Sequence, residues 1–500
     1  MRYFVLIAFL THASLHLQAQ NENDKFSKQL IPTILELSEF VGLPSDAHFP
    51  DDILKNIDWL HQAFENRGFE TQELTTSSRP LFFAEMIISK ELPTVLFYMH
   101  LDGQPVDPEK WNQPGPYQVV LKELNNNGIW EALSWQSLDG PIDREWRLFG
   151  RAVADDKGPI IAFLNTIDIL HADKAEIKCN IKVILDSEEE IGSPNLAPAV
   201  KNSKDILAAD VLIIADGPTH VSGEPTLVFG CRGITTLNLT TYGPVVPQHS
   251  GHYGNYAPNP AFAMARLLTS MKDEDGIVLI EGYYDGIELS SDVKASLAAV
   301  PDNEKSIHDL LQIAWNEKVG NNYQESLQYP SLNVRGLSSG WVGAQARTIV
   351  PDIAEAAIDI RLVPESDPER LFSLIKEHIT EQGYHIVDHD PTKQERLTFK
   401  NIVKIETRKA TLPFRTEMDS EAGVWLRNAL SSQFDSETVN IRIMGGTVPI
   451  APFVRELDIP AIIVPVVNAD NNQHSPNENL RIGNLITAMQ SFHAILTTSM

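Results

Sequence analysis

The sequence predicts an α/β protein whose catalytic domain is built on a mostly parallel sheet and carries a smaller, inserted α+β domain. Three observations support this prediction. In the first half of the chain, short and continuously apolar runs, typical of buried strands, alternate with amphipathic stretches, typical of helices. From about Thr235 the strand pattern changes to an alternation of apolar and polar residues, as in a half-buried strand. Beyond Glu421 the first pattern returns, so the region between is predicted to be an insertion.

The chain of 500 residues, 43% of them hydrophobic, is too long for one ordinary domain. At its start, Arg2 precedes an apolar run over 4–10 that is too short to span a bilayer as a helix. Residues 1–20 are therefore interpreted as a cleaved secretory signal. The mature protein is expected to be soluble and exported, to a periplasmic or extracellular location. The later apolar runs are also too short to cross a membrane.

Acidic residues outnumber basic ones, with 67 Asp and Glu against 40 Lys and Arg and a formal net charge of −27. Such a surface repels phosphate backbones and anionic lipid headgroups, so neither nucleic acid nor a membrane is expected as a partner. The two cysteines, Cys179 and Cys231, are too few for a disulfide framework or a thiolate metal site. Both are interpreted as small core residues, although an oxidising compartment would allow them to pair.

The first half of the chain contains the predicted parallel strands. The strands are 94–98, 181–185 and 211–215, and the predicted helices are 51–67 and 159–170. Each strand leads directly into a segment with acidic residues or histidine. Because sites in open α/β sheets form beyond the carboxyl ends of the strands, we expect these segments to converge in space.

The predicted insertion has the element order β-α-β-α. Its elements are a strand at 235–241, a helix at 260–271, a strand at 354–362 and a helix at 368–382, and the first pattern returns at 421–432 and 462–466. The predicted domains are the signal at 1–20, a catalytic domain formed by 21–234 and 413–500, and the inserted domain at 235–412.

Five segments at predicted strand ends carry groups suited to a metal site. They contain His100 with Asp102, Asp155 with Asp156, the glutamates 188–190, Asp216, and His474. Residues two apart in a strand point the same way, so His100 and Asp102 can share one side. Taken singly, each segment has an ordinary explanation as a surface histidine, a helix N-cap or a solvated charge run. Together they supply nitrogen and oxygen ligands, one carboxylate to share between two zinc ions, and another to deprotonate a bridging water.

In joint order these segments resemble the di-zinc metallopeptidases that include carnosinase-type dipeptidases, glutamate carboxypeptidase and aminoacylase. The resemblance covers most of the mature chain. It implies two zinc ions per chain, with manganese or cobalt as alternatives. It implies that His100 and Asp216 bind one ion, that Glu190 and His474 bind the other, and that Asp155 bridges both.

The same resemblance assigns supporting roles around the ligands. It implies that Asp102 orients the neighbouring histidine ligand and that Glu189, next to a ligand, is the general base. It also implies a cis peptide bond between Asp155 and Asp156.

The inserted domain resembles the lid and dimerisation domain of that family. Its segment 248–255 is similar to one in which a histidine at the place of His249 reaches the partner subunit's active site and polarises the scissile carbonyl. The strand around Arg361 resembles one whose arginine grips the substrate carboxylate. The loop with Gly446 and Thr447 resembles one that hydrogen-bonds the C-terminal end of the substrate. The resemblance therefore implies a homodimer.

The expected function is zinc-dependent hydrolysis of dipeptides, or of the C-terminal residue of short peptides, by a metal-bridging water that a glutamate activates. An N-acyl amino acid deacylase with the same metal site is the first alternative. A non-catalytic exported binding protein is the second, and Glu189 argues against it because ligand binding alone needs no general base.

Overall fold

The computed structural model describes residues 25–500, so the interpreted signal at 1–20 lies outside the described residues. The chain divides into two compact units. The first unit comprises the chain up to Phe229 together with Thr416–Asn440 and Pro452–Met500, and the second comprises Gly230–Arg415 and Ile441–Ala451. Among residues 25–500, no helix is both long and apolar enough to cross a bilayer.

An eight-stranded sheet forms the centre of the first unit, in the order β1-β2-β7-β3-β8-β20-β9-β19. The strands are β1 (Glu70–Leu74), β2 (Leu81–Met86), β3 (Thr94–His100), β7 (Asn180–Asp186), β8 (Val211–Ile214), β9 (Thr226–Val228), β19 (Val439–Ile441) and β20 (Ala461–Ile463). The adjoining strands β7, β3, β8 and β20 are parallel, whereas β1, β2 and β9 pair antiparallel. The predicted α/β class is confirmed, and the apolar runs form parallel strands because both of their faces are buried.

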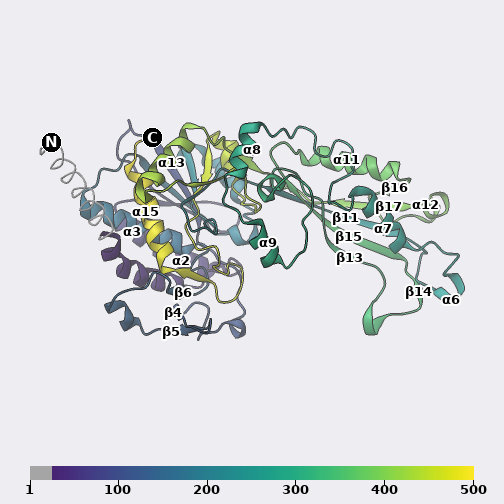
Figure 1. Ribbon diagram of the computed structural model, residues 1–500, viewed down its shortest axis with the longest axis horizontal. Helices are drawn as coiled ribbons and strands as arrows, with labels where there is room; N and C mark the ends of the chain where they lie inside the picture. The colour runs from purple at the N-terminus through teal and green to yellow at the C-terminus, as the bar shows by residue number, and fades with distance from the viewer. Residues whose placement is uncertain (1–24) are drawn as a thin grey trace, which may run out of the picture. The chain divides into compact units, whose positions relative to one another are not determined.

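Helices cover both faces of this sheet. The helices against one face are α2 (Pro50–Glu65), α3 (Lys157–Asp173), α13 (Glu421–Phe434) and α15 (Ile482–Thr497) (Figure 1). On that face Phe97 of β3 packs against Phe163 of α3, with ring centroids 5.0 Å apart, and against Phe492 of α15 at 6.1 Å. The next residue, Tyr98, points the other way and meets Phe453 of α14 (Ala451–Leu457), with centroids 5.6 Å apart.

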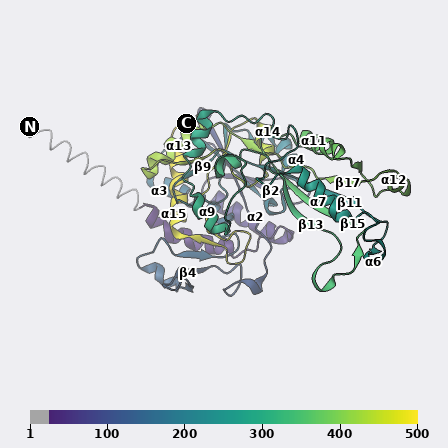
Figure 2. The same ribbon diagram turned by 45° about the vertical axis from the view of Figure 1, so that its right-hand side comes forward.

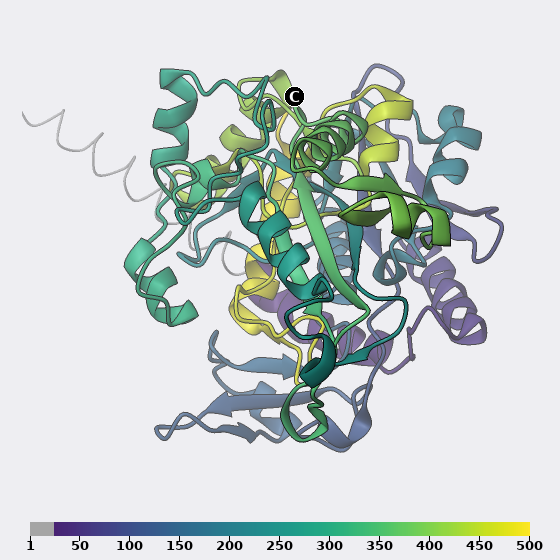
Figure 3. The same ribbon diagram turned by 90° about the vertical axis from the view of Figure 1, so that its right-hand side faces the viewer.

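A separate four-stranded sheet in the first unit has the order β21-β6-β4-β5. Figure 3 shows its N-terminal strands in blue at the lower left. The strands are β4 (Val120–Leu124), β5 (Trp130–Ala132), β6 (Arg147–Phe149) and β21 (Asn479–Arg481). Because β6 pairs with β21, the chain just before Asp155 is hydrogen-bonded to the chain just after His474. This sheet therefore joins two of the five segments that the sequence singled out.

The second unit contains a five-stranded sheet in the order β13-β15-β11-β17-β16. The strands are β11 (Gly233–Tyr242), β13 (Asn333–Ser338), β15 (Ile353–Leu362), β16 (His385–Val387) and β17 (Ile402–Thr407). Helices α7 (Pro260–Met271) and α11 (Pro368–Glu381) cover one face of this sheet (Figure 2). Alternate residues of β11 and β15 point toward these helices and form a core with them. The apolar–polar alternation of the sequence is thus the pattern of a sheet covered on one side.

Short elements complete the two units. They are α4 (Leu196–Asn202), α5 (Lys204–Leu207), α6 (Ser250–Tyr253), α8 (Ser291–Ala298), α9 (Glu304–Leu311), α10 (Tyr323–Ser326), α12 (Lys393–Thr398), β10 (Gly230–Cys231), β12 (Gln248–His249), β14 (Ile349–Val350) and β18 (Phe414–Arg415). Cys179 and Cys231 are free, buried thiols, as the interpretation of small core residues predicts.

Candidate metal centre

His100 ends β3 at the carboxyl edge of the large sheet, and its side chain is 1% exposed. Its Nδ1 lies 3.1 Å from the backbone oxygen of Asp102 and 3.4 Å from the Asp102 carboxylate, which fixes the ring plane. Its Nε2 therefore faces Asp155, whose Oδ1 is 2.9 Å away. Burial lowers the pKa of His100, but the carboxylates of Asp102 and Asp155 outweigh burial and raise that pKa well above its usual value.

The fully buried carboxylate of Asp102 also holds the two glutamates that follow β7. It accepts hydrogen bonds from the backbone N–H of Glu189 at 3.1 Å and of Glu190 at 3.0 Å. These residues begin the single turn η3 (Glu189–Ile191). Asp102 thus ties the position of His100 to that of both glutamates, a link that the sequence did not reveal.

Asp155 lies between the two histidines. Its Oδ1 contacts His100, and its Oδ2 is 3.1 Å from Nε2 of His474. Burial raises the pKa of Asp155, but the two histidines outweigh it and hold that pKa well below the usual range. The bond from Asp155 to Asp156 is cis, as the resemblance implied, and the Asp156 carboxylate accepts the backbone N–H of His100 at 3.2 Å.

Two ligand triads share Asp155 among the residues that the structure describes. In one triad, ligand atoms of His100, Asp155 and Asp216 all lie within 4.8 Å of one another, and the same holds for Asp155, Glu190 and His474. Oε2 of Glu190 is 3.3 Å from Nε2 of His474. The five side chains expected to be ligands are therefore brought together from separate strand ends, with Asp155 common to both groups.

The chemistry of these side chains fits a pair of divalent cations. Burial, followed by the charge of Asp155, raises the pKa of Glu190 to about 7 and that of Asp216 to about 6. Oδ2 of Asp155 is buried, and its 3.1 Å contact with Nε2 of His474 lacks the angles of a hydrogen bond. Crowded carboxylates next to two imidazole nitrogens are the ligand set expected for zinc-like ions, and cations would relieve the repulsion among the carboxylates.

Glu478 supports the shared ligand from behind, and sequence reasoning gave it no role. Its fully buried carboxylate accepts N–H groups from the backbone of Ala152, Ala154 and Asp155 at 3.0–3.1 Å, and from the Arg151 side chain at 2.7 Å. The sequence signal for it was weak, because Glu478 is simply one more acid in a polar segment. Its supporting role is visible only in the structure, because the backbone N–H groups that it accepts lie more than 300 residues away in the chain.

The residues expected to bind substrate lie in the second unit, whereas the five expected ligands lie in the first. Nη1 of Arg361 donates to Oγ1 of Thr447 at 2.7 Å, and that hydroxyl donates to the backbone oxygen of Arg232 at 2.6 Å. Gly446 is exposed beside them. His249 is exposed too; it is the last residue of β12 and caps α6, its Nδ1 accepting the backbone N–H of Gly251 at 3.0 Å.

Comparison with known proteins gives concordant matches along nearly the whole chain. The family model described as Peptidase family M20/M25/M40 matches residues 96–498. The Cys-Gly metallodipeptidase DUG1 of Saccharomyces cerevisiae is 24% identical over 95% of this chain and 96% of its own length. The Beta-Ala-His dipeptidase of Homo sapiens is 26% identical over 83% of this chain and 76% of its own length.

Solved structures match as well. The M20 family metallo-carboxypeptidase Sso-CP2 from Sulfolobus solfataricus superposes with a TM-score of 0.73 at 26% identity, over 93% of this chain and 98% of that chain. The crystal structure of human carnosine dipeptidase 1 gives a TM-score of 0.71 at 22% identity, over 96% of this chain and 98% of that chain.

The comparisons correct the expected location. Export to a periplasmic or extracellular location is wrong as an expectation, because the yeast Cys-Gly metallodipeptidases, which match so much of this chain, are cytosolic. The apolar run that prompted the expectation is short and lies outside the described residues. Nothing in the comparisons supports a secretory signal.

Proposed function

Because this chain belongs to the M20/M25/M40 peptidase family, we propose that it hydrolyses dipeptides, or the C-terminal residue of short peptides, with two bound metal ions. The observation that carries the proposal is the pair of ligand triads that share Asp155, with Glu189 beside them. Relatives named as dipeptidases on Cys-Gly and Beta-Ala-His support peptides over N-acyl amino acids as substrates.

We propose zinc as the metal, with manganese or cobalt as alternatives. His100 and Asp216 would hold one ion and Glu190 and His474 the other, with Asp155 between them. Imidazole nitrogens and carboxylate oxygens in such a set suit zinc. When bound, the ions would supply Lewis acidity at the scissile carbonyl and at the attacking water.

Glu189 is the proposed general base. Burial, together with the charges of Asp216 and Glu190, raises the pKa of its carboxyl well above the usual value, although His100 acts in the opposite direction. A carboxylate with a raised pKa takes a proton from water more readily and can then give it to the leaving amine nitrogen. The Asp102 carboxylate holds Glu189 by accepting its backbone N–H. The backbone oxygen of Asp102 also orients His100, one of the proposed ligands.

Arg361 is the proposed clamp for the substrate carboxylate. Its only side-chain hydrogen bond in the described chain goes to Thr447, so its other N–H groups remain available to a ligand. A guanidinium binds a carboxylate through paired hydrogen bonds, which would orient the amide bond for attack. Gly446 and Thr447 would complete this contact.

A homodimer formed through the second unit is also proposed. Apolar side chains gather at the end of this unit around β12, where Val245, Tyr256 and Leu397 are 73%, 88% and 75% exposed and line one shallow depression. Large exposed apolar patches mark interaction sites. His249 lies next to this patch in sequence, which supports a role across a two-fold interface.

The proposal is tested with Glu189→Gln. This variant should keep about two metal ions per chain while its turnover of dipeptides falls roughly a hundredfold or more, the usual scale of general acid–base catalysis. Asp155→Asn is the matched control and should lose metal and activity together. Metal content is measured by elemental analysis, and hydrolysis is measured on a panel of dipeptides, longer peptides and N-acyl amino acids.

Three results would contradict the proposal. Loss of metal from Glu189→Gln would make Glu189 a ligand and not the base. A metal-loaded wild-type protein that cleaves only the N-acyl amino acids would assign deacylation instead, and one that cleaves none of the panel would leave a binding protein.

A further inference from the structure

A buried arginine in the second unit has few hydrogen-bond acceptors for its guanidinium. Arg232, between β10 and β11, is 8% exposed. Its Nη2 donates to the backbone oxygen of Tyr329 at 3.1 Å, the one hydrogen bond of this guanidinium in the described chain, and its Nε has no partner. A guanidinium offers donors on each of its nitrogens, and leaving them unpaired in the interior is unfavourable.

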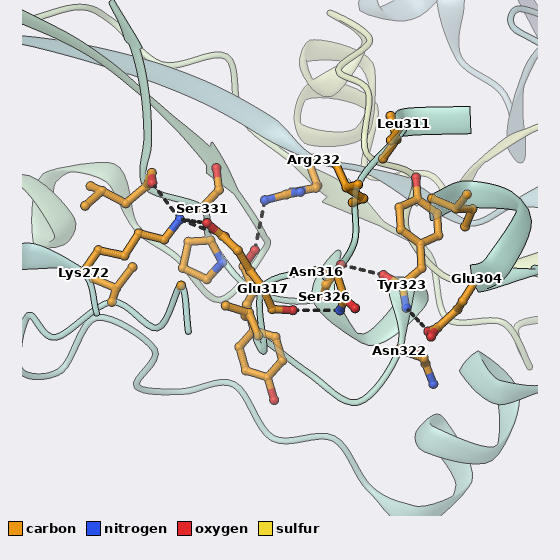
Figure 4. Close-up of a pocket in the computed structure, with 18 of the residues that line it drawn as sticks. Arg232, Lys272, Glu304, Leu311, Asn316, Glu317, Asn322, Tyr323, Ser326 and Ser331 are labelled. Atoms are coloured by element: carbon orange, nitrogen blue, oxygen red, sulfur yellow. Dashed lines mark hydrogen bonds and ion pairs between the residues drawn. The ribbon is translucent and has the colours of Figure 1, made fainter. Parts of the chain in front are cut away.

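This arginine faces a cavity of about 280 Å³, near the lower end of the roughly 300–1,000 Å³ usual for small-molecule sites. Figure 4 shows the Arg232 side chain between Ser331 and Tyr323 in the wall of the cavity. Tyr284 and Tyr329 also line it, with ring centroids 5.5 Å apart. The site therefore combines apolar ring surfaces with one cation.

Of the other charged side chains in the cavity wall, Lys272 and Glu317 pair with each other, and Glu304 accepts a backbone N–H. Lys272 is 2.8 Å from both oxygens of Glu317, and Oε1 of Glu304 accepts the backbone N–H of Tyr323 at 3.2 Å (Figure 4). Within residues 25–500, no carboxylate forms an ion pair with Arg232. Burial and the nearby charge of Arg361 lower the pKa of Arg232 to about 10. In a chain with a net charge of −27, this uncompensated buried cation stands out.

We propose that the cavity binds the carboxylate of a small organic molecule, with the Arg232 guanidinium as its partner. An anion there would satisfy the unpaired donors, and a buried guanidinium–carboxylate contact is strong because it is charge-assisted. The carboxylate has two candidate sources. It belongs either to an acidic side chain of a peptide substrate or to a separate ligand.

The substrate source rests on the proposed function. Oγ1 of Thr447 joins the side chain of Arg361 to the backbone of Arg232, so the proposed clamp and the cavity arginine share one hydrogen-bonded residue. A C-terminal Asp or Glu would present two carboxylates to these two arginines.

The direct test is titration of the metal-loaded full chain with glutarate in a calorimeter. We expect saturable binding that weakens at least tenfold in Arg232→Met, while the uncharged glutaramide does not bind. Arg335→Met is the control and should bind like wild type, because Arg335 is an exposed arginine of the same unit whose side chain makes no hydrogen bond or ion pair within residues 25–500. Absence of glutarate binding by wild type would overturn the proposal. Unchanged glutarate binding by Arg232→Met would also overturn it, for example if only Arg361→Met fails to bind glutarate.

Asn322→Asp guards against a folding defect in the arginine variant. Asn322 lines the cavity and caps α10 by accepting the backbone N–H of Glu325 at 2.8 Å. Aspartate caps a helix equally well, so the variant should fold while adding a negative charge to the wall. We expect glutarate to bind several-fold more weakly, and unchanged affinity in this folded variant would also refute the proposal.

Kinetics then identify the source of the carboxylate. If it is a substrate side chain, glutarate competes with a dipeptide ending in Glu, and Arg232→Met raises KM for that dipeptide more than for its Gln counterpart. If it is a separate ligand, glutarate does not compete and the two KM values change alike. Glutarate binding is measured without turnover. The carboxylate site can therefore be refuted while the proposed peptidase activity holds, and the peptidase activity can be refuted while glutarate still binds.

Discussion

At the scale of single residues, the buried acid Glu478 contacts the backbone around Asp155, the residue proposed to be shared by the two metal ions. Its carboxylate gathers three backbone N–H groups around the shared ligand and pairs with Arg151, which itself lies over the ring of Trp111 at 5.4 Å. Partners that hold metal ligands from behind commonly affect metal affinity about 10–100-fold. We therefore propose Glu478 as a positioning residue for Asp155.

Glu478→Gln should lower both thermal stability and metal affinity. An amide group cannot accept on both sides, so some of these N–H groups lose their acceptor and Arg151 loses its counter-charge, which costs about 3–5 kcal/mol for a buried pair. The thermal midpoint and the metal dissociation constant are measured for each protein. Glu437→Gln, at an exposed glutamate, is the control and should match wild type in both. If Glu478→Gln kept wild-type metal affinity, its role would be purely structural.

The residues at strand ends could be predicted from the sequence because each follows an apolar run. His100 is the last residue of the buried strand β3, and Asp216 lies two residues beyond the end of the buried strand β8, so the sequence pattern shows both their types and their places. Gln104, whose Nε2 donates to Glu190 at 2.7 Å, and Glu478 could not be predicted. Their partners are distant in the chain, and a polar residue in a loop has no pattern that distinguishes it from a solvated one.

At the scale of elements, the start of α3 is tightly packed. A Cβ on Gly158 would lie 2.3 Å from the backbone oxygen of Val153 and 2.7 Å from Leu480. The sequence Asp155-Asp156-Lys157-Gly158 thus needs glycine because β21 and the preceding turn leave no room for a side chain. This close approach sets where α3 begins relative to Asp155.

Gly158→Ala should destabilise the protein by at least about 2 kcal/mol, because the added methyl group overpacks the interior and forces the neighbouring backbone to move. The displaced turn should also reduce the number of metal ions bound per chain. Gly115→Ala is the matched control, because its Cβ meets nothing within 4 Å, and it should leave both quantities unchanged. Thermal unfolding and elemental analysis are the measurements. An unaltered midpoint for Gly158→Ala would show that the turn adapts freely.

Elements with strong periodicity were predicted well, and short strands were not. The strand expected at 181–185 is β7 at Asn180–Asp186, and the helix expected at 159–170 is α3 at Lys157–Asp173. The segment 111–146 contains β4 and β5, which pair with one another along an exposed edge. Such short strands bury little, so their residues carry no clear alternation, and the pairing of β4 with β6 is set by contacts that a local pattern does not encode.

At the scale of the whole molecule, the proposal requires two chains for one active site. His249 belongs to the second unit and the ligands to the first, and the apolar patch beside His249 is suited to a partner. Stabilisation of the oxyanion by a histidine from the other subunit would make activity depend on assembly.

The test is complementation between two inactive chains. Mixed dimers of His249→Ala and Glu189→Gln should regain activity, because one of the two sites then receives an intact histidine and an intact base. Each variant alone, carried through the same mixing procedure, is the control and should remain inactive. Activity is measured on the most rapidly cleaved dipeptide and mass by light scattering. A fully active monomer would disprove the assembly proposal.

The chain enters the second unit twice, once as Gly230–Arg415 and once as Ile441–Ala451. A gene deletion that removed only the long segment would leave the short one behind, and Thr447 would lose its hydrogen bonds to both Arg232 and Arg361. The second unit is therefore not a removable cassette. Chimaeras that exchange this unit between homologues have to transfer both segments together, and so does any evolutionary recombination that swaps it.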